Sequence, residues 1–361
     1  MRRRVLIALL FLFGSACSSG TWAEAPTLED EAGEIGIDQE LGSAIDDFVG
    51  SRDGGVVVLL DRDGSRYLFA VGTANAAGDL LETDQPFRVG SIAKTFVATI
   101  VLQMVDEGSV DLDQPLGSYL PESPVGADVT VRQLLGHDSG IANYTEQSAF
   151  GSRLMAQPEE AVRPEETIRF VADRDLGTPG QFSYSNTNYI LLGQLIEAVD
   201  GTDLNSALAE RITELLGLDN TYFATADRPG NDDLALGWSD GFIQGDAATS
   251  YVAMETAAWA AGSLVSTAED LADFLDALFD EKLISIDRIG EMTFTGTDGY
   301  GLGLFTAALG PAGAGYAHNG SIPGYHSTMG VVPRTGDKLV ILTNNDRLVA
   351  DVLAAELVAI W

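Results

Sequence analysis

The sequence predicts a mixed α/β (α+β) fold, with one antiparallel sheet built from both ends of the chain and a large helical region between them. Strand patterns occur at residues 55–71 and again at 301–343, whereas residues 91–290 mostly show helical periodicity. Strands at both termini with helices between them favour a single sheet flanked by helices. A ligand cleft is expected between the sheet and the helical region.

The N-terminal part of this fold begins with a helix. Apolar residues recur at helical spacing over 37–48, and the apolar run 55–60 predicts a buried strand. Residues 61–64 form a hairpin turn, because Gly64 can adopt a positive φ, and 67–71 return as the partner strand.

The remaining elements follow from periodicity and from the Gly, Pro, Asn and Asp clusters that separate them. The expected helices are 91–107, 129–135, 165–173, 187–199, 203–214, 267–280 and 284–292. The C-terminal part predicts strands at 301–306, 327–332 and 338–343, a turn at 333–336 and a final helix at 348–360. No internal repeat is visible.

Charge restricts the possible partners. The 361 residues include 54 acidic and 20 basic side chains, a net charge of −34, and three of the basic residues are lysines. Such a surface repels phosphate backbones and anionic membranes, which argues against nucleic-acid binding. Apolar residues make up 45% of the chain, enough for a sizeable core.

The N-terminus predicts export. Residues 1–4 are basic, 5–13 form an apolar run too short to span a bilayer, and small residues precede Cys17. This resembles a bacterial lipoprotein signal in which Cys17 becomes lipidated, with ordinary cleavage nearby as the alternative. We therefore expect a signal peptide at 1–17, a flexible tether at 18–37 and a folded domain at 38–361. The protein would be a cell-envelope lipoprotein or secreted, with a lipid anchor as its only membrane attachment.

Cysteine and histidine usage excludes several kinds of site. Cys17 is the only cysteine, so no intramolecular disulfide, thiolate nucleophile or cysteine-based metal site is expected. The three histidines, His137, His318 and His326, lack metal-ligand spacing. We expect neither a metal nor an organic cofactor.

Three short motifs carry the predicted chemistry. Ser91 and Lys94 lie three residues apart and share one face of a helix that begins at Ser91. A serine at a helix N-terminus beside an amine suits nucleophilic catalysis, although an N-cap serine near a surface lysine would show the same spacing.

The second and third motifs follow along the chain. Tyr184 lies on a loop before a helix and could transfer protons, and Asn186 could hold Lys94 and a substrate amide. His318, Asn319 and Gly320 lie on a strand that could pair with substrate, where Gly320 permits close backbone approach. A backbone N–H of this strand could supply half of an oxyanion hole.

Taken in order, Ser-x-x-Lys, Tyr-x-Asn and His-x-Gly resemble the family that unites class C β-lactamases, D-alanyl-D-alanine carboxypeptidases of the same fold, and related esterases and D-aminopeptidases. Further segments agree with this family from about residue 40 to the end, namely 134–141, 261–271, 300–303 and 344–345. The resemblance implies the β-lactamase/transpeptidase-like, or penicillin-recognising, fold.

The resemblance also implies roles for these residues in an acyl-enzyme mechanism. Ser91 is the nucleophile, and Lys94 and Tyr184 relay its proton to the leaving group. The N–H groups of Ser91 and Ser321 hold the oxyanion. Asn186, His318, Asn319 and Gly320 form the substrate-binding set.

One departure bears on the substrate. Class C β-lactamases carry Lys-Thr-Gly in the third motif, whereas this chain has His318, Asn319 and Gly320. The histidine form is closer to D,D-peptidases and lowers the expected turnover of β-lactams. At its ordinary pKa, His318 would also make activity depend on pH between about 5 and 8.

The sequence therefore predicts an exported D-alanyl-D-alanine carboxypeptidase or peptidase. An esterase or a β-lactamase on the same fold is one alternative, and a catalytically silent binding or sensor domain is another. The substrate would accordingly be a small peptide, an ester or a β-lactam.

Overall fold

The computed structural model describes residues 37–224, 234–239, 252–296 and 298–360. The predicted signal peptide, Cys17 and the tether up to residue 36 lie outside the described residues. Helix α1 (Ile37–Val49) begins one residue before the predicted start of the folded domain. Each helix in the described part of the chain is too short or too polar to cross a membrane.

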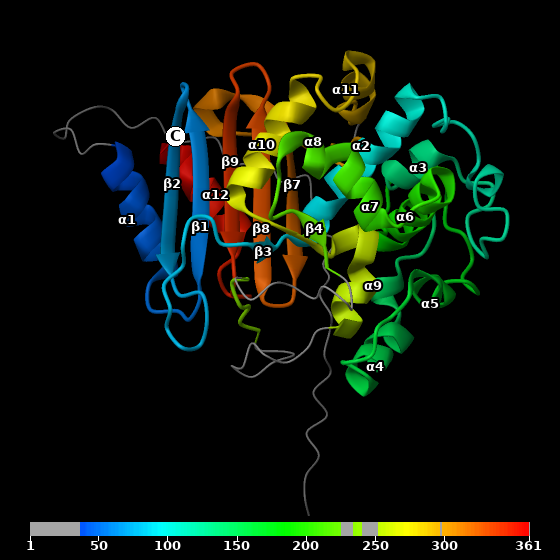
Figure 1. Ribbon diagram of the computed structural model, residues 1–361, viewed down its shortest axis with the longest axis horizontal. Coiled ribbons are helices and arrows are strands. Elements are labelled where there is room, and N and C mark those ends of the chain that lie inside the picture. The colour runs from blue at the N-terminus through cyan, green and yellow to red at the C-terminus, as the bar shows by residue number, and fades with distance from the viewer. Residues whose placement is uncertain (1–36, 225–233, 240–251, 297, 361) are drawn as a thin grey trace, which may run out of the picture.

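The two ends of the chain share one sheet. Its order is β2-β1-β9-β8-β7-β6, and all neighbouring strands are antiparallel (Figure 1). Its strands are β1 (Gly55–Arg62), β2 (Ser65–Gly72), β6 (Phe305–Ala308), β7 (Ala314–Ile322), β8 (Tyr325–Val332) and β9 (Asp337–Thr343). Pairing of β1 with β9 joins the N-terminal hairpin to the C-terminal strands, which confirms the predicted architecture.

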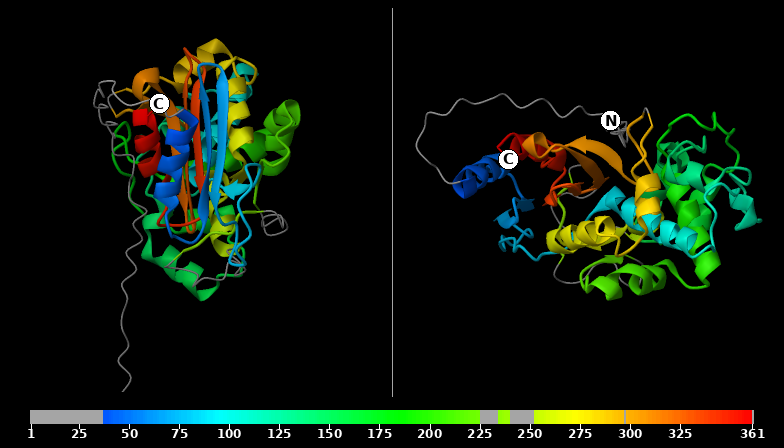
Figure 2. Two further views of the ribbon diagram at one scale, coloured as in Figure 1. Left: turned by 90° about the vertical axis from the view of Figure 1, so that its left-hand side faces the viewer. Right: turned by 90° about the horizontal axis from the view of Figure 1, so that it is seen from above.

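Strand alternation divides the apolar residues of this sheet between two cores. In β1, Val57 and Leu59 face the core shared with the helical region, whereas Val56 and Val58 face a second core. Helices α1 and α12 (Ala350–Ile360) cover that second face, as Figure 2 shows. The strand is therefore buried on both faces, as its continuous apolar run predicted.

The middle of the chain forms the helical region and a small second sheet of order β3-β5-β4. Its helices are α2 (Ala93–Asp106), α3 (Val131–Leu135), α4 (Ser148–Ala156), α5 (Pro164–Arg169), α6 (Asn186–Asp200), α7 (Leu204–Leu208), α8 (Glu214–Leu216), α9 (Val252–Gly262), α10 (Ala268–Phe279) and α11 (Ile286–Met292). The short strands are β3 (Phe87–Arg88), β4 (Tyr222–Phe223) and β5 (Leu264–Ser266). Side-chain caps at Thr130, Thr267 and Ser285 fix the starts of α3, α10 and α11.

Several predicted elements differ in detail; the helix expected at 165–173, for example, ends at Arg169. The single helix expected at 203–214 is α7, a π-helical turn (Ala209–Thr213) and α8. The strand expected at 301–306 begins only at Phe305, because the preceding glycines turn the chain. A Cβ on Gly301 would stand 2.1 Å from the Met292 carbonyl oxygen of α11, and one on Gly303, which has φ +85°, would stand 2.6 Å from the Ala98 Cβ of α2, so this segment follows a tight path between the two helices.

Candidate active site

Ser91 lies in one turn of 3-10 helix, Gly90–Ile92, which leads directly into α2. Regular α-helix therefore begins at Ala93 rather than at Ser91 as predicted. The turn still brings the two side chains together, because Lys94 Nζ donates a hydrogen bond to Ser91 Oγ over 2.9 Å. Ser91 is partly exposed, whereas Lys94 is fully buried. The amine thus stands behind a hydroxyl that a substrate can reach.

The surroundings of Lys94 hold its amine in place. Nζ also donates to the Ala261 carbonyl over 2.5 Å, and it lies 5.0 Å from the ring centroid of Tyr184 and 5.6 Å from that of Tyr189. A carbonyl and two aromatic faces favour the ammonium form, whereas burial opposes it. These opposed influences suit an amine that must both hold and release a proton.

Tyr184 precedes α6 on the loop predicted to carry it, and its side chain is half-buried. Its ring flanks the Lys94 amine, with the centroid 5.0 Å from Nζ. The same ring packs against the imidazole of His137, with centroids 4.1 Å apart, and lies 6.4 Å from the ring of Tyr300. The structure thus brings together the three side chains expected to carry the chemistry.

His318 is on β7, facing Lys94, but its environment differs from the one predicted. The side chain is buried, and Nδ1 lies 2.6 Å from the Asn319 carbonyl oxygen, which can only accept, so Nδ1 carries the proton. Nε2 then accepts from the Tyr300 hydroxyl over 3.1 Å. Burial, followed by the charge of Lys94, lowers the pKa of His318 to about 3.

The expectation that His318 titrates between pH 5 and 8 was therefore wrong. It assumed the ordinary pKa of an exposed imidazole, whereas this ring is enclosed. Both ring nitrogens are engaged within the protein, so the side chain supports the strand and is not placed to bind substrate directly.

Asn319 was also misplaced by the sequence analysis. Successive side chains of a strand point to opposite faces, so Asn319 faces away from its neighbours His318 and Gly320. Its Nδ2 donates to Asp351 Oδ2 over 2.7 Å, on helix α12 behind the sheet. The side chain fixes β7 to α12 and does not line the site.

Gly320 permits the close approach that the sequence predicted. A Cβ at this position would stand 2.0 Å from the Val89 carbonyl oxygen and 3.0 Å from the Ser91 backbone nitrogen. Across the same gap, a Cβ on Gly90, which has φ +52°, would stand 2.9 Å from the Ser321 nitrogen. Two glycines therefore let β7 press against the nucleophile turn, and the amides of Ser91 and Ser321 border one narrow gap.

Asn186 begins α6 beside this site. Its N–H donates to Asn143 Oδ1 over 3.2 Å, and its Nδ2 donates to Thr145 Oγ1 over 3.4 Å. The expected contact with Lys94 is absent from the hydrogen bonds of Asn186 in the described part of the chain. Its amide is oriented by the turn at Tyr144–Glu146 instead.

Sequence reasoning gave His137 no role, although it lies at the centre of the site. Its ring contacts Tyr184, and its centroid lies 5.2 Å from Tyr189 and 4.9 Å from Tyr300. The available signal was the segment 134–141, which matched the family without pointing to a function. No group of side chains suited to a metal ion is present among the described residues.

Comparisons with known proteins agree with this geometry. A family model described as Beta-lactamase matches residues 42–360. The chain is 27% identical over 263 residues to the putative penicillin-binding protein PbpX of Bacillus subtilis, covering 72% of this chain and 62% of that protein. It is 31% identical over 188 residues to esterase EstB of Burkholderia gladioli, covering 48% of each. The chain spans about half the length of the curated relatives it matches.

Two solved structures align over almost their whole length. A D-stereospecific amidohydrolase from Streptomyces sp. has a TM-score of 0.75 at 29% identity, covering 88% of this chain and 96% of that one. The D-amino acid amidase of Ochrobactrum anthropi SV3 has a TM-score of 0.76 at 28% identity, covering 90% and 97%. The family match and the shared fold agree, and the chain therefore belongs to the beta-lactamase family of serine hydrolases.

Proposed function

We propose that this protein forms an acyl-enzyme on Ser91 and hydrolyses an amide bond next to a D-configured residue. The proposed substrates are of two types: a peptide that ends in D-alanyl-D-alanine, and the amide of a D-amino acid. The observation that carries the proposal is the 2.9 Å hydrogen bond from Lys94 Nζ to the accessible Ser91 hydroxyl, with the ring of Tyr184 beside the amine.

In this mechanism Ser91 Oγ attacks the substrate carbonyl carbon and passes its proton to the Lys94 and Tyr184 pair. The pair delivers that proton to the leaving nitrogen as the C–N bond breaks. Water then attacks the ester carbonyl, the acid departs, and a proton returns to Ser91 Oγ. The amides of Ser91 and Ser321 would hold the oxyanion in both stages, where one donor is typically worth about 3 kcal/mol.

The preference for amides and for D-residues rests on similarity. The two solved structures described above are named for D-stereospecific amide hydrolysis, and curated relatives include penicillin-binding proteins. Asn186, at the start of α6, is the side chain we propose to orient the substrate amide. Export, with a lipid on Cys17, belongs to the same proposal, because a peptide ending in D-alanine is a substrate of the cell envelope.

Esterase activity is the second candidate, and the similarity to esterase EstB favours it. The two activities make different demands on Tyr184. An amide nitrogen must be protonated before it leaves, whereas p-nitrophenolate leaves without a proton. Tyr184→Phe should therefore impair amide hydrolysis far more than p-nitrophenyl ester hydrolysis.

The test is a panel of substrates assayed side by side with the wild-type protein, Tyr184→Phe and Ser91→Ala. The panel contains a D-Ala-D-Ala peptide, D- and L-phenylalanine amide, p-nitrophenyl acetate and nitrocefin. We expect turnover of D-configured amides, little of the L-amide, and loss of both in Ser91→Ala. Ester turnover alone, or equal rates with D- and L-amides, would contradict the proposal.

A further inference from the structure

The loop that carries Tyr184 is held along the segment 137–140 by backbone hydrogen bonds. The donors and acceptors are Gly177 N–H to the Gly140 carbonyl (2.7 Å), Gly180 N–H to the Asp138 carbonyl (2.7 Å), Ser183 N–H to the His137 carbonyl (2.7 Å) and Ser185 N–H to His137 Nδ1 (3.2 Å). His137 supplies two of these four acceptors, one on each side of Tyr184. His137 therefore holds the backbone on both sides of the phenol, and Ser185 Oγ adds a hydrogen bond to the Ala142 carbonyl over 3.3 Å.

The ring of His137 also contacts the ring of Tyr184. Their centroids are 4.1 Å apart with an interplanar angle of 38°. His137 is fully buried, with the rings of Tyr189 and Tyr300 on its other sides. Because the imidazole is enclosed, it is a fixed surface against which the phenol packs.

Two features of His137 are costly for a merely structural residue. Its φ of +58° is a backbone conformation that residues with a Cβ seldom adopt. Its Nδ1 accepts from a backbone N–H, so the neutral ring carries its proton on Nε2. That buried Nε2 has no hydrogen-bond partner among the described residues. Strain and unsatisfied buried groups persist chiefly where function requires them.

We propose that His137 is the positioning residue for Tyr184. Its carbonyl and Nδ1 fix the backbone on both sides of the tyrosine, and its ring sets the plane of the phenol beside the Lys94 amine. This inference rests on the proposed function of Ser91, Lys94 and Tyr184.

His137 does not act as an acid or a base in this arrangement. The titratable groups that face it are Lys94, His318, Tyr184, Tyr189 and Tyr300. Burial, followed by the charge of Lys94, lowers its pKa well below the ordinary value. Protonation of Nδ1 would also remove the acceptor that holds the Ser185 N–H. The ring therefore works in its neutral form, through geometry.

The test is a double-mutant cycle on the amide substrate, with His137→Ala, Tyr184→Phe and both changes combined. A misplaced general acid typically costs about 100-fold, so His137→Ala should lower kcat by about that factor with little change in KM. Because His137 acts through Tyr184, the double variant should be no slower than Tyr184→Phe alone. Losses that multiply, or full activity of His137→Ala, would overturn the inference.

His137→Asn is the rescue variant. It also replaces His137→Ala in the double-mutant cycle if the alanine variant does not fold. Asparagine tolerates a positive φ, and its Oδ1 can accept from Ser185, but it lacks the ring. It should restore about a tenth of wild-type kcat and keep the wild-type pH profile between pH 5 and 8. Loss of a limb of that profile in His137→Asn would show that the imidazole itself transfers protons, and would overturn the positioning role.

His326→Asn is the control at a second histidine, because this ring lies at the start of β8 and reaches the Asp346 carbonyl beyond the end of β9, so the change should leave kcat unchanged. Labelling of wild-type Ser91 by a fluorophosphonate separates the two proposals. If the wild type is neither labelled nor active, the proposed function fails. If the wild type is labelled and active while the cycle shows independent losses, only the role of His137 fails.

Discussion

Two arginine–carboxylate systems in this protein share their chemistry and differ in burial. The first is the ion pair between Arg88 and Glu255, whose side chains are 12% and 2% exposed. Arg88 is on β3, three residues before Ser91, and its Nη1 also donates to the Tyr325 hydroxyl over 2.9 Å. Glu255 is on α9, the helix whose Ala261 carbonyl accepts from Lys94. The pair therefore joins the two segments that hold Ser91 and the Lys94 amine.

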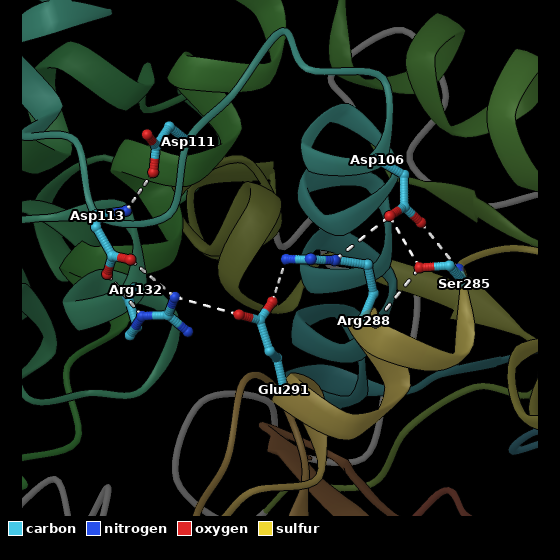
Figure 3. A network of polar contacts seen from close by, with 7 residues as sticks. All are labelled: Asp106, Asp111, Asp113, Arg132, Ser285, Arg288 and Glu291. Atoms are coloured by element: carbon cyan, nitrogen blue, oxygen red, sulfur yellow. Dashed lines mark hydrogen bonds and ion pairs between the residues drawn. The ribbon is translucent and has the colours of Figure 1, made fainter.

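The second system lies at the surface, where α2, α3 and α11 meet (Figure 3). Its side chains are 24–71% exposed. Its ion pairs form a continuous series that runs from Asp106 through Arg288, Glu291 and Arg132 to Asp113. Ser285, the cap of α11, donates its N–H and its hydroxyl to Asp106 over 2.9 Å each. This network ties three helices together without an ion pair to Ser91, Lys94 or Tyr184.

Burial, rather than the number of ion pairs, therefore decides how much each arginine contributes to stability. Removing one partner of a buried pair leaves an uncompensated charge in the interior. Removing one member of an exposed network leaves groups that water can solvate. We therefore expect both stability and activity to depend on Arg88 and Glu255, and neither to depend strongly on the surface network.

The largest effect is expected from Glu255→Gln. The variant keeps the shape of the side chain but removes the carboxylate from Arg88, which should lower the free energy of unfolding by about 3–5 kcal/mol. Urea denaturation followed by circular dichroism measures this change. A loss below about 1 kcal/mol would show that water screens the pair in solution.

The combined variant Arg88→Met with Glu255→Leu separates charge from position in the same experiment. Replacing both charges by apolar groups of similar size is often neutral for stability. Stability should therefore recover in this variant. Activity should stay reduced, because the bonds that fix β3 against α9 and Tyr325 are gone. Recovery of both would show that the pair only stabilises the fold.

Lowering the pH should reduce stability through the buried region before it affects the surface network. The pKa of His318 is about 3 when folded and about 6.5 when unfolded, so below pH 6.5 the unfolded chain binds the extra proton. Stability is then complete above pH 6.5 and falls by at most about 1.4 kcal/mol per pH unit toward pH 3. Between pH 6.5 and 5 this amounts to about 1.6 kcal/mol.

Denaturation series in wild type and His318→Gln measure that slope, which should be shallower in the variant. Equal slopes would mean that the ring is solvated. At the surface, the hydrogen bond from Arg132 lowers the pKa of Asp113, so its carboxylate stays charged through this pH range. Kinetic profiles of wild type should likewise show no limb from His318 between pH 5 and 8.

The smallest effect is expected from Glu291→Gln, which interrupts the surface network between Arg132 and Arg288. The free energy of unfolding should fall by about 0.2–1 kcal/mol, and kcat should not change. The difference from wild type should shrink further in 1 M salt, where exposed charges are screened. A loss as large as that of Glu255→Gln would remove the distinction between the two regions.

Much of this fold could be predicted from local patterns. The strand alternation at 55–60, the hairpin glycine and the helix periodicities depend on neighbours along the chain, and the ordered motifs indicated Ser91, Lys94 and Tyr184. The orientation of Asn319 was also accessible, since alternation places it opposite Gly320 once the strand is recognised.

Features that depend on distant contacts could not be predicted. The partner of Arg88 is 167 residues away, on a helix that periodicity did not indicate, so neither burial nor pairing was visible. The pKa of His318 depends on enclosure by Tyr300 and Lys94. The role of His137 depends on a positive φ and on a loop about 46 residues later in the chain, neither of which has a local sequence signature.

The most direct test of the central claim is the rate at which a fluorophosphonate labels Ser91, followed by intact-protein mass and peptide mapping. We expect one adduct, located on Ser91 and absent from Ser91→Ala. It should form at least about 100-fold more slowly in Lys94→Met, which removes the amine but keeps the packing. Labelling of Ser91 at an equal rate in Lys94→Met, or an adduct on another residue, would contradict it.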